Sequence, residues 1–250
     1  MESQRLRDCL EADFRRLREV AARADPGARV PSCPEWAMSD LVRHVGAVYL
    51  HKVECMRLGR DPDPWPPAGL DGEPPLELLD RGYAALTREF AARRPGDHAF
   101  TWYEPDQSVG FWIRRMAQET VIHRVDAELG AGEPISGIPA DLAADGVDEL
   151  LVVFVQYGTT GWPEEFAGLL KAAGDRLVSV VTPQQSWKLR LTSRDVRVDE
   201  SAADSPAAVV EGPAADVLLW LWNRAGAGAV ATGDEETIAL LHEVLVASTQ

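Results

Sequence analysis

The sequence predicts a mixed fold, α plus α/β, in which an N-terminal four-helix bundle precedes a smaller C-terminal α+β domain. Three observations support this prediction. Apolar residues recur at helical spacing in four long segments before residue 130. A stretch rich in glycine and proline at 130–139 is typical of a linker. After residue 177, the chain contains short apolar segments, one with clear period-two alternation, as strands have. We therefore expect domains at 1–133 and 140–250.

The four N-terminal helices are delimited by proline, glycine and capping residues. The expected helices span 2–24, 40–58, 76–93 and 109–129. Ser39 is a good N-cap for the second helix, and Asp40 lies in its first turn, where the helix dipole favours an acidic side chain. A proline-punctuated loop at 30–36 precedes this helix, and a long loop rich in Pro, Gly and Asp follows it at 59–75. Helices of this length joined by loops are typical of a bundle.

The C-terminal half combines helices with strands. A helix is expected at 140–154, strands at 177–181, 187–192 and 207–211, and a last helix at 235–246. Between them, Pro213 opens a helix that continues to about Asn223, because proline is favoured in a first helical turn. This order of elements indicates an α+β domain.

Composition excludes several classes of function. The formal net charge of −15 and the pI of about 4.7 argue against binding to nucleic acid or to anionic membranes. The chain has no run of about 18 apolar residues and no signal-peptide pattern at its polar N-terminus. Its three cysteines are an odd number without paired spacing, so a disulfide framework is not expected. We expect a cytoplasmic protein whose partners are small molecules.

A candidate metal site comes from two of the expected helices. Glu119 and His123 are four residues apart, so they share one helix face and can hold one ion together. His44, on the second helix, can supply a third ligand if its apolar stripe faces the same bundle core. Two imidazoles and one carboxylate suit zinc, which keeps an open coordination position in catalytic sites. The same ligands would accept iron, manganese or nickel.

The residues alone leave alternatives open. His44 and His123 can also be hydrogen-bonded core histidines, with Glu119 paired to an arginine such as Arg115. His51 lies seven residues after His44 on the same face. It is a candidate for a fourth ligand or for a cofactor contact, and the alternative is a histidine at the rim of the bundle.

Four further residues near these positions have a functional and a structural interpretation. Asp126 and Asp40 lie one turn from the two candidate histidine ligands and can accept hydrogen bonds from their rings, or they are surface charges. Cys33 is interpreted as a packed loop residue and not as a nucleophile, because no histidine adjoins it. Trp36 is interpreted as a core anchor.

Three motifs, taken in order, resemble those of the mycothiol-dependent maleylpyruvate isomerase family. They are PSCPEW at 31–36, DLVRH at 40–44 and ETVIHRVD at 119–126. The segment EGPAADVLLWLWNR at 211–224 is similar to the C-terminal signature of this family. The resemblance covers nearly the whole chain. It implies a DinB-like four-helix domain with a His–Glu–His metal site, followed by an α+β domain related to sterol-carrier folds.

The resemblance also implies roles for individual residues. It makes His44, Glu119 and His123 the metal ligands and Arg224 a candidate catalytic residue that binds substrate; the alternative is a surface arginine near a helix C-terminus. Two positions depart from the family pattern. Gln118 stands where relatives often have histidine, and Val125 where they often have tryptophan. Neither change removes a ligand, but both alter the expected pocket.

The function that the resemblance implies is thiol chemistry at a divalent metal, with zinc favoured and mycothiol as co-substrate. Such an enzyme would attack a small electrophile, either in a cis–trans isomerisation like that of maleylpyruvate or in a thiol S-transfer. A surplus of arginine over lysine, 22 to 3, fits the GC-rich genome of an actinobacterial host. Two alternatives stay open at this point: a metal hydrolase of a small ester, amide or thioester, and a non-catalytic protein that binds a metal or ligand.

Overall fold

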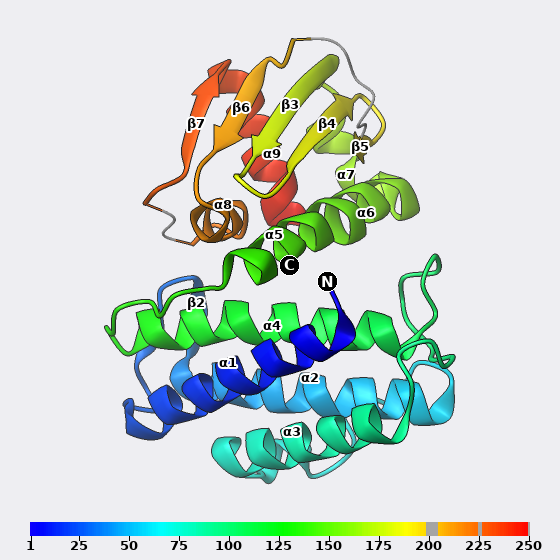
Figure 1. The fold of residues 1–250 in the computed structure, drawn as a ribbon, viewed down its shortest axis with the longest axis vertical. Coiled ribbons are helices and arrows are strands. Elements are labelled where there is room, and N and C mark those ends of the chain that lie inside the picture. Colours follow the sequence, from blue (N-terminus) through cyan, green and yellow to red (C-terminus); the bar gives the residue numbers. More distant parts are fainter. Residues whose placement is uncertain (199–204, 225–226, 250) are drawn as a thin grey trace. The chain divides into compact units, whose positions relative to one another are not determined.

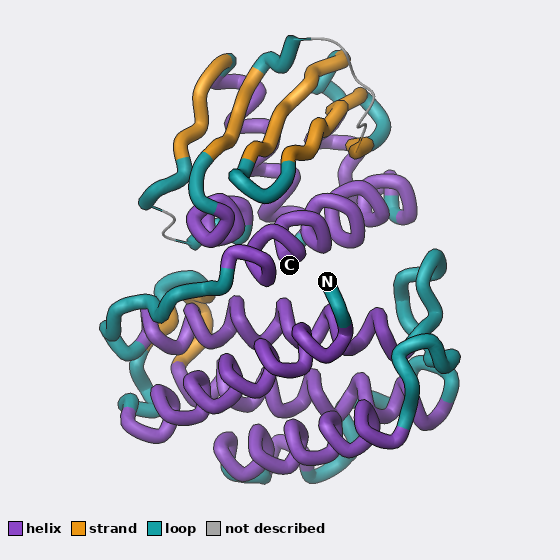
Figure 2. Tube along the Cα trace, viewed as in Figure 1, coloured by secondary structure: helices purple, strands orange, loops and turns teal. Residues whose placement is uncertain are grey.

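A helical bundle and an α+β unit make up the structure, a computed structural model that describes residues 1–198, 205–224 and 227–249. The first unit is Met1–Ser136 and the second is Gly137–Gln250. Figure 1 shows long helices in the first unit and a sheet with helices in the second, and Figure 2 shows how strands concentrate in the second. This architecture confirms the predicted mixed fold class.

Four long helices form the first unit. They are α1 (Ser3–Arg23), α2 (Met38–Leu58), α3 (Pro75–Ala92) and α4 (Val109–Gly130). α1 packs along α4 and α2 along α3, and α2 also contacts α4. The contact between α2 and α4 joins the two helices that carry the candidate metal ligands. Each helix begins and ends within about three residues of its predicted bounds.

The start of α2 differs from the prediction. Its N-cap is Ala37, and the carboxylate of Asp40 accepts a hydrogen bond from the Ala37 N–H at 2.8 Å. Ser39 is not the cap but already lies inside the helix. The backbone N–H groups of the first two helical residues donate to the carbonyls of Ala28 and Pro26. Because the preceding segment satisfies these donors, a serine cap is not required.

A short hairpin replaces the loop expected before α2. β1 (Arg29–Val30) pairs antiparallel with β2 (Cys33–Ala37), which leads directly into α2. The prolines in this stretch predicted a loop, but a two-stranded ribbon of this length tolerates them because its edges need no further partner. After α2, the chain enters the predicted long loop, which contains one 3₁₀ turn at Leu70–Gly72.

α2 and α3 approach each other closely at two glycines. A Cβ atom on Gly82 would lie 2.6 Å from the carbonyl oxygen of Gly46, and one on Gly46 would lie 2.8 Å from the backbone nitrogen of Leu79. Contacts this short to backbone atoms leave no room for a side chain. The pair therefore determines how near α3 lies to the part of α2 that carries His44.

The second unit contains a five-stranded sheet of order β5-β4-β3-β6-β7, in which β3 and β6 are parallel and the other neighbours antiparallel. The strands are β3 (Asp175–Val181), β4 (Ser186–Thr192), β5 (Val196–Val198), β6 (Ala208–Glu211) and β7 (Val230–Gly233). The helices are α5 (Ala140–Glu149), a π-helical turn at Leu150–Gln156, α6 (Tyr157–Gly161), α7 (Pro163–Leu170), α8 (Ala214–Leu221) and α9 (Glu235–Ser248). Central strands β3, β4 and β6 were predicted, and edge strands β5 and β7 were not.

α4 is the most buried element of the bundle. Almost every residue from Val109 to Glu128 is buried, including charged side chains such as Arg124 and Asp126. Buried charges persist only when they are paired, and Arg124 is bonded to Asp13 and Glu128. In the described part of the chain, no helix is long and apolar enough to cross a membrane.

Candidate metal centre

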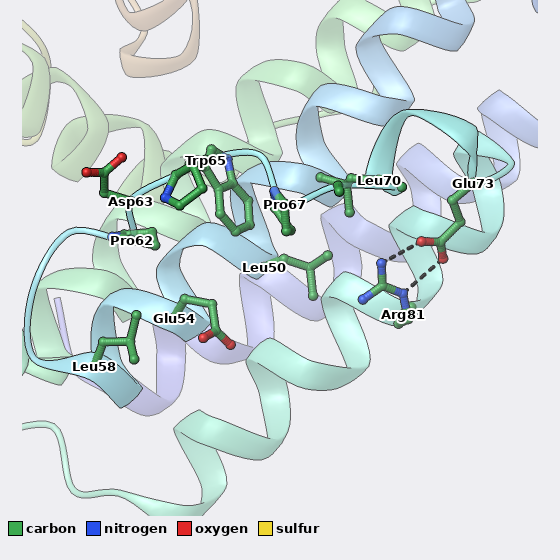
Figure 3. Close-up of a pocket in the computed structure, with 13 residues that line it drawn as sticks. Leu50, Glu54, Leu58, Pro62, Asp63, Trp65, Pro67, Leu70, Glu73 and Arg81 are labelled. Atoms are coloured by element: carbon green, nitrogen blue, oxygen red, sulfur yellow. Dashed lines mark hydrogen bonds and ion pairs between the residues drawn. The ribbon is translucent and has the colours of Figure 1, made fainter.

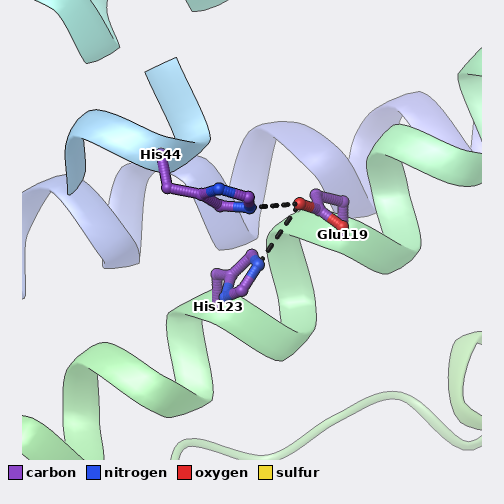
Figure 4. A group of neighbouring side chains, drawn as sticks. All are labelled: His44, Glu119 and His123. Carbon is purple, nitrogen blue, oxygen red and sulfur yellow. Dashed lines mark hydrogen bonds and ion pairs between the residues drawn. The ribbon is translucent and has the colours of Figure 1, made fainter. Parts of the chain in front are cut away.

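Three side chains from two helices converge in the bundle. α2 supplies His44, and α4 supplies Glu119 and His123, one helical turn apart (Figure 4). Nε2 of His44 and Nε2 of His123 each lie 3.2 Å from the same oxygen, Oε1 of Glu119. The three potential ligand atoms lie within 4.8 Å of one another. Two imidazole nitrogens and a carboxylate oxygen at this spacing fit the donor set of a divalent metal ion.

A second carboxylate orients the ring of His123. Oδ2 of Asp126 lies 2.9 Å from Nδ1 of His123, and because a carboxylate only accepts, Nδ1 is the donor. The hydroxyl of Ser32, in the turn between β1 and β2, donates to the other oxygen of Asp126. This arrangement leaves Nε2 of His123 as the ring atom that faces Glu119. The prediction that Asp126 accepts a hydrogen bond from the ring of His123 is confirmed.

Arg115 holds the other side of the Glu119 carboxylate. Its Nη2 lies 2.6 Å from Oε2 of Glu119, one turn earlier on α4. The two oxygens thus have different partners: Oε1 faces the imidazoles and Oε2 faces the guanidinium. The ion pair with Arg115, considered as an alternative to metal binding, exists together with the cluster of three. It holds the carboxylate in place without occupying the oxygen that faces the histidines.

The surroundings favour a positive charge between these residues. Burial alone would raise the pKa of Glu119, but His123, His44 and Arg115 together hold it well below its usual range. Burial alone would lower the pKa of His123, but Glu119 and Asp126 outweigh this effect and raise it to about 9. In the absence of a metal, His123 therefore keeps a proton near neutral pH. A cation bound there would take the place of that proton.

Trp36 borders the cluster. Its ring centroid lies 4.7 Å from that of His44 and 6.1 Å from that of His123, and the side chain is half-buried. The sequence interpretation as a core anchor missed this position beside the site. The hairpin that positions Trp36 was not predicted, so its neighbourhood could not be inferred. Cys33 lies on the same strand and is also half-buried, and none of the three cysteines, which all lie in the described part of the chain, forms a disulfide.

The remaining predicted residues lie outside the cluster of three. His51 faces Cys55 and Asp61 and packs against Trp65. Its role as a cofactor contact therefore stays a prediction, and it does not join the cluster as a fourth ligand. Asp40 is occupied as the cap of α2 and does not orient His44.

Arg224 lies in the second unit, just after α8. Its Nη1 donates to the carbonyl of Trp222 at 2.6 Å, and its guanidinium lies 5.6 Å from the centre of the Trp222 ring. It is half-buried. Substrate binding by Arg224 stays a prediction.

Comparison with known proteins places both units in one family. Residues 7–128 match the model of the mycothiol maleylpyruvate isomerase N-terminal domain, and residues 141–240 match the model of the C-terminal domain of the same family. None of the curated proteins compared matches the chain.

Solved structures agree with this assignment at the level of the fold. A crystal structure of the mycothiol-dependent maleylpyruvate isomerase superposes with a TM-score of 0.63 at 15% identity, covering 93% of each chain. A variant of that enzyme with a histidine replaced by alanine gives 0.62, with the same identity and coverage.

Proposed function

The chain belongs to the mycothiol maleylpyruvate isomerase family, and from this membership we propose that it is an enzyme that directs a low-molecular-weight thiol, mycothiol, against a small electrophile. The observation that carries the proposal is the convergence of two imidazoles and one carboxylate on a common point. On α4, Asp126 holds the far side of the His123 ring, and Arg115 holds the far oxygen of Glu119. We propose zinc as the metal, since three protein ligands with an open position are typical of its catalytic sites.

The role proposed for the metal is to make a bound thiol more acidic. A divalent cation held by these three side chains would act as a Lewis acid that converts a thiol of pKa near 8.5 into a thiolate at neutral pH. We propose that the nucleophile is the thiol of a co-substrate and not that of Cys33 on β2, because the family to which the chain belongs is named for mycothiol.

The residues of the chain would bind and position the reactants. His44, the most exposed of the three ligands at 36%, marks the side from which a co-substrate can reach the centre. Trp36 offers an aromatic surface beside it. We propose that Arg224 binds a carboxylate of the electrophile, because a guanidinium can hold a carboxylate with two parallel hydrogen bonds.

Two outcomes of the same attack are compatible with this site. In an isomerisation, the thiolate sulfur adds to one carbon of an activated cis double bond, and the electron pair of that bond moves onto the activating carbonyl. The resulting single bond rotates, the electron pair returns, and the thiolate leaves to give the trans product. In an S-transfer, the carbon–sulfur bond persists. In an addition the neighbouring carbon takes up the proton that the thiol has lost, and in a displacement the leaving group departs with the bonding electron pair and that proton is released. The choice depends on the electrophile.

A reaction screen tests the proposal. The purified protein, loaded with zinc, is incubated with mycothiol and a panel of electrophiles that includes maleylpyruvate, and products are identified by mass spectrometry. We expect turnover that requires both the thiol and the metal. Turnover of an ester, amide or thioester without thiol would favour a hydrolase. Metal binding without any turnover across the panel would favour a non-catalytic binding protein.

A further inference from the structure

A second cluster of metal-ligating side chains lies farther along α2. His51 and Cys55 are four residues apart on one face of the helix, and Asp61 follows at the start of the long loop. Sγ of Cys55 lies 3.5 Å from Nδ1 of His51 and 4.0 Å from Oδ1 of Asp61. Nε2 of His51 lies 3.5 Å from the same Asp61 oxygen. With one ring nitrogen of His51, Sγ of Cys55 and one carboxylate oxygen of Asp61, the three potential ligand atoms lie within 4.8 Å of one another, close enough to hold one ion together.

We propose that His51, Cys55 and Asp61 form a second site for a divalent metal ion of the zinc class, separate from the centre formed by His44, Glu119 and His123. The combination of a thiol, an imidazole and a carboxylate selects zinc or a similar borderline cation over magnesium or calcium. The two sites share α2 but have no ligand in common. Seven residues separate His44 from His51, about 10 Å along the helix axis.

One positive and two negative groups would lie next to the proposed ion. Lys52 lies 3.1 Å from Nδ1 of His51, and its positive charge opposes a second cation there. A thiolate on Cys55 and the carboxylate of Asp61 bring two negative charges, which balance the two charges of the metal. The thiol proton goes to solvent when the metal binds, as in other cysteine-ligated sites.

The site would connect the long loop to the helix beneath it. Asp61 belongs to this loop, and Trp65, four residues later, packs edge-on against the His51 ring with centroids 4.9 Å apart. Figure 3 shows the loop passing over α2, with Trp65 directed toward Leu50 and a groove between loop and helix. A metal at this point would fix the beginning of the loop that covers the groove.

Cobalt(II) distinguishes the two sites because only one contains sulfur. Cobalt chloride is titrated into the metal-free, reduced, full-length protein in the absence of mycothiol. We expect two equivalents to bind, one of them with a sulfur-to-cobalt charge-transfer band in the near ultraviolet. The centre at His44 has nitrogen and oxygen donors alone, so this band would report the second site.

Variants assign the band to its residues. Cys55→Ser should lose the band and one equivalent of cobalt, and Cys33→Ser should keep both. Asp61→Asn should weaken cobalt binding at the second site, because a neutral amide replaces an anionic carboxylate ligand. Because Asp61 is exposed, this variant tests the site even if Cys55→Ser disturbs the core. His44→Ala should lose the other equivalent and keep the band, which separates this proposal from the proposed function.

Two results would overturn the second site. One is a wild-type protein that binds a single equivalent without a charge-transfer band. The other is a band that survives in Cys55→Ser or disappears in Cys33→Ser.

Discussion

Asp126 accepts a hydrogen bond from Nδ1 of His123 at 2.9 Å, and this contact decides which nitrogen of His123 faces the candidate metal centre. With Nδ1 donating to Asp126, Nε2 is the ring nitrogen that points toward Glu119, and the proton on Nε2 is the one that a metal ion would displace. Asp126 is fully buried and receives a second hydrogen bond from Ser32. A buried carboxylate in this position both orients the imidazole and makes it a more basic ligand.

Replacing Asp126 by asparagine should weaken metal binding. The amide can still occupy the same space, but it carries no charge and can present its NH₂ group to Nδ1, which would favour the other ring tautomer. We expect zinc affinity to fall about 10- to 100-fold, the usual effect of removing such a partner. A competition titration with a chromophoric chelator would measure the change.

Asp40→Asn is the matched control for this substitution. It removes a carboxylate that caps α2 and touches none of the three ligands. Its zinc affinity should equal that of the wild type, with little loss of stability, because the asparagine side-chain oxygen can still accept a hydrogen bond from the Ala37 N–H. Equal affinities in Asp126→Asn and the wild type would show that His123 does not depend on Asp126 for its orientation.

Removing the imidazole of His44 should abolish metal binding with little effect on folding. His44 is about one-third exposed, so His44→Ala creates no buried cavity. We expect the metal bound at this centre after dialysis to fall to background, and thiol-dependent turnover to be lost with it. The thermal midpoint of the metal-free protein should change little. Elemental analysis of the Cys55→Ser background isolates this centre from any second ion.

His242→Ala provides a control for the loss of a histidine. This residue lies on α9 in the second unit, where it contacts Asn223. The variant should keep its metal and its turnover. A His44→Ala protein that retains one equivalent of zinc in the Cys55→Ser background would contradict the assignment of His44 as a ligand.

The metal-free protein should lose stability as the pH rises from about 6.5 to about 9. The folded-state pKa of His123 is about 9, against an ordinary value of 6.5, since Glu119 and Asp126 outweigh the effect of burial. Below pH 6.5 both states hold the proton, and the stabilisation is fully present. It is lost as the pH passes through the folded-state pKa. Urea unfolding at a series of pH values measures this change.

Bound zinc should reverse the loss of stability with rising pH. The ion must displace the proton of His123, so its affinity increases with pH up to about 9. A His123→Asn variant serves as control, because the slope of stability between these pH values should become smaller without the imidazole. A wild-type stability that rises across this window without metal would contradict the assignment of the raised pKa.

The close approach of α2 and α3 can be tested at Gly82. Alanine normally stabilises a helix relative to glycine by about 1 kcal/mol. At Gly82 the new Cβ would meet the Gly46 carbonyl at 2.6 Å, and a backbone atom cannot move aside cheaply. We therefore expect Gly82→Ala to be destabilising by about 1–3 kcal/mol. Gly72→Ala, where a Cβ meets nothing within 4 Å, should be nearly neutral. Calorimetry of both variants would show whether alanine lowers the stability at Gly82, where an ordinary helix position would gain stability.

The helices that carry the site were predictable from their length and from the breaks rich in proline and glycine around them, although α4 is buried on nearly all sides and shows little apolar period. Glu119 and His123 share a face whatever the rest of the fold does, so their pairing followed from spacing alone. His44 and His51 also share a face, and spacing alone could not show which of them lies beside Glu119 and His123. The contact between α2 and α4 brings His44 to Glu119, while the long loop brings Asp61 to His51.

The elements that the sequence missed are short. β5 and β7 have three and four residues at the edges of the sheet, too few for an alternating pattern to appear. The β1–β2 hairpin is hidden by its prolines. Because this hairpin carries Trp36 to the two histidines, its absence from the prediction also concealed the aromatic border of the site.

Trp36 should affect substrate binding more than metal binding. Its ring lies against His44 and His123 but offers no ligand atom. In Trp36→Ala we expect an unchanged zinc affinity and a KM for the electrophile or the thiol raised about 10-fold or more, the effect of losing the burial of one large apolar side chain. Trp36→Phe should restore part of the loss, because a smaller aromatic ring can still cover the reactants. Steady-state kinetics and a zinc titration on both variants separate the two roles. A fall in zinc affinity with unchanged KM would instead mean that Trp36 only supports the positions of the histidines.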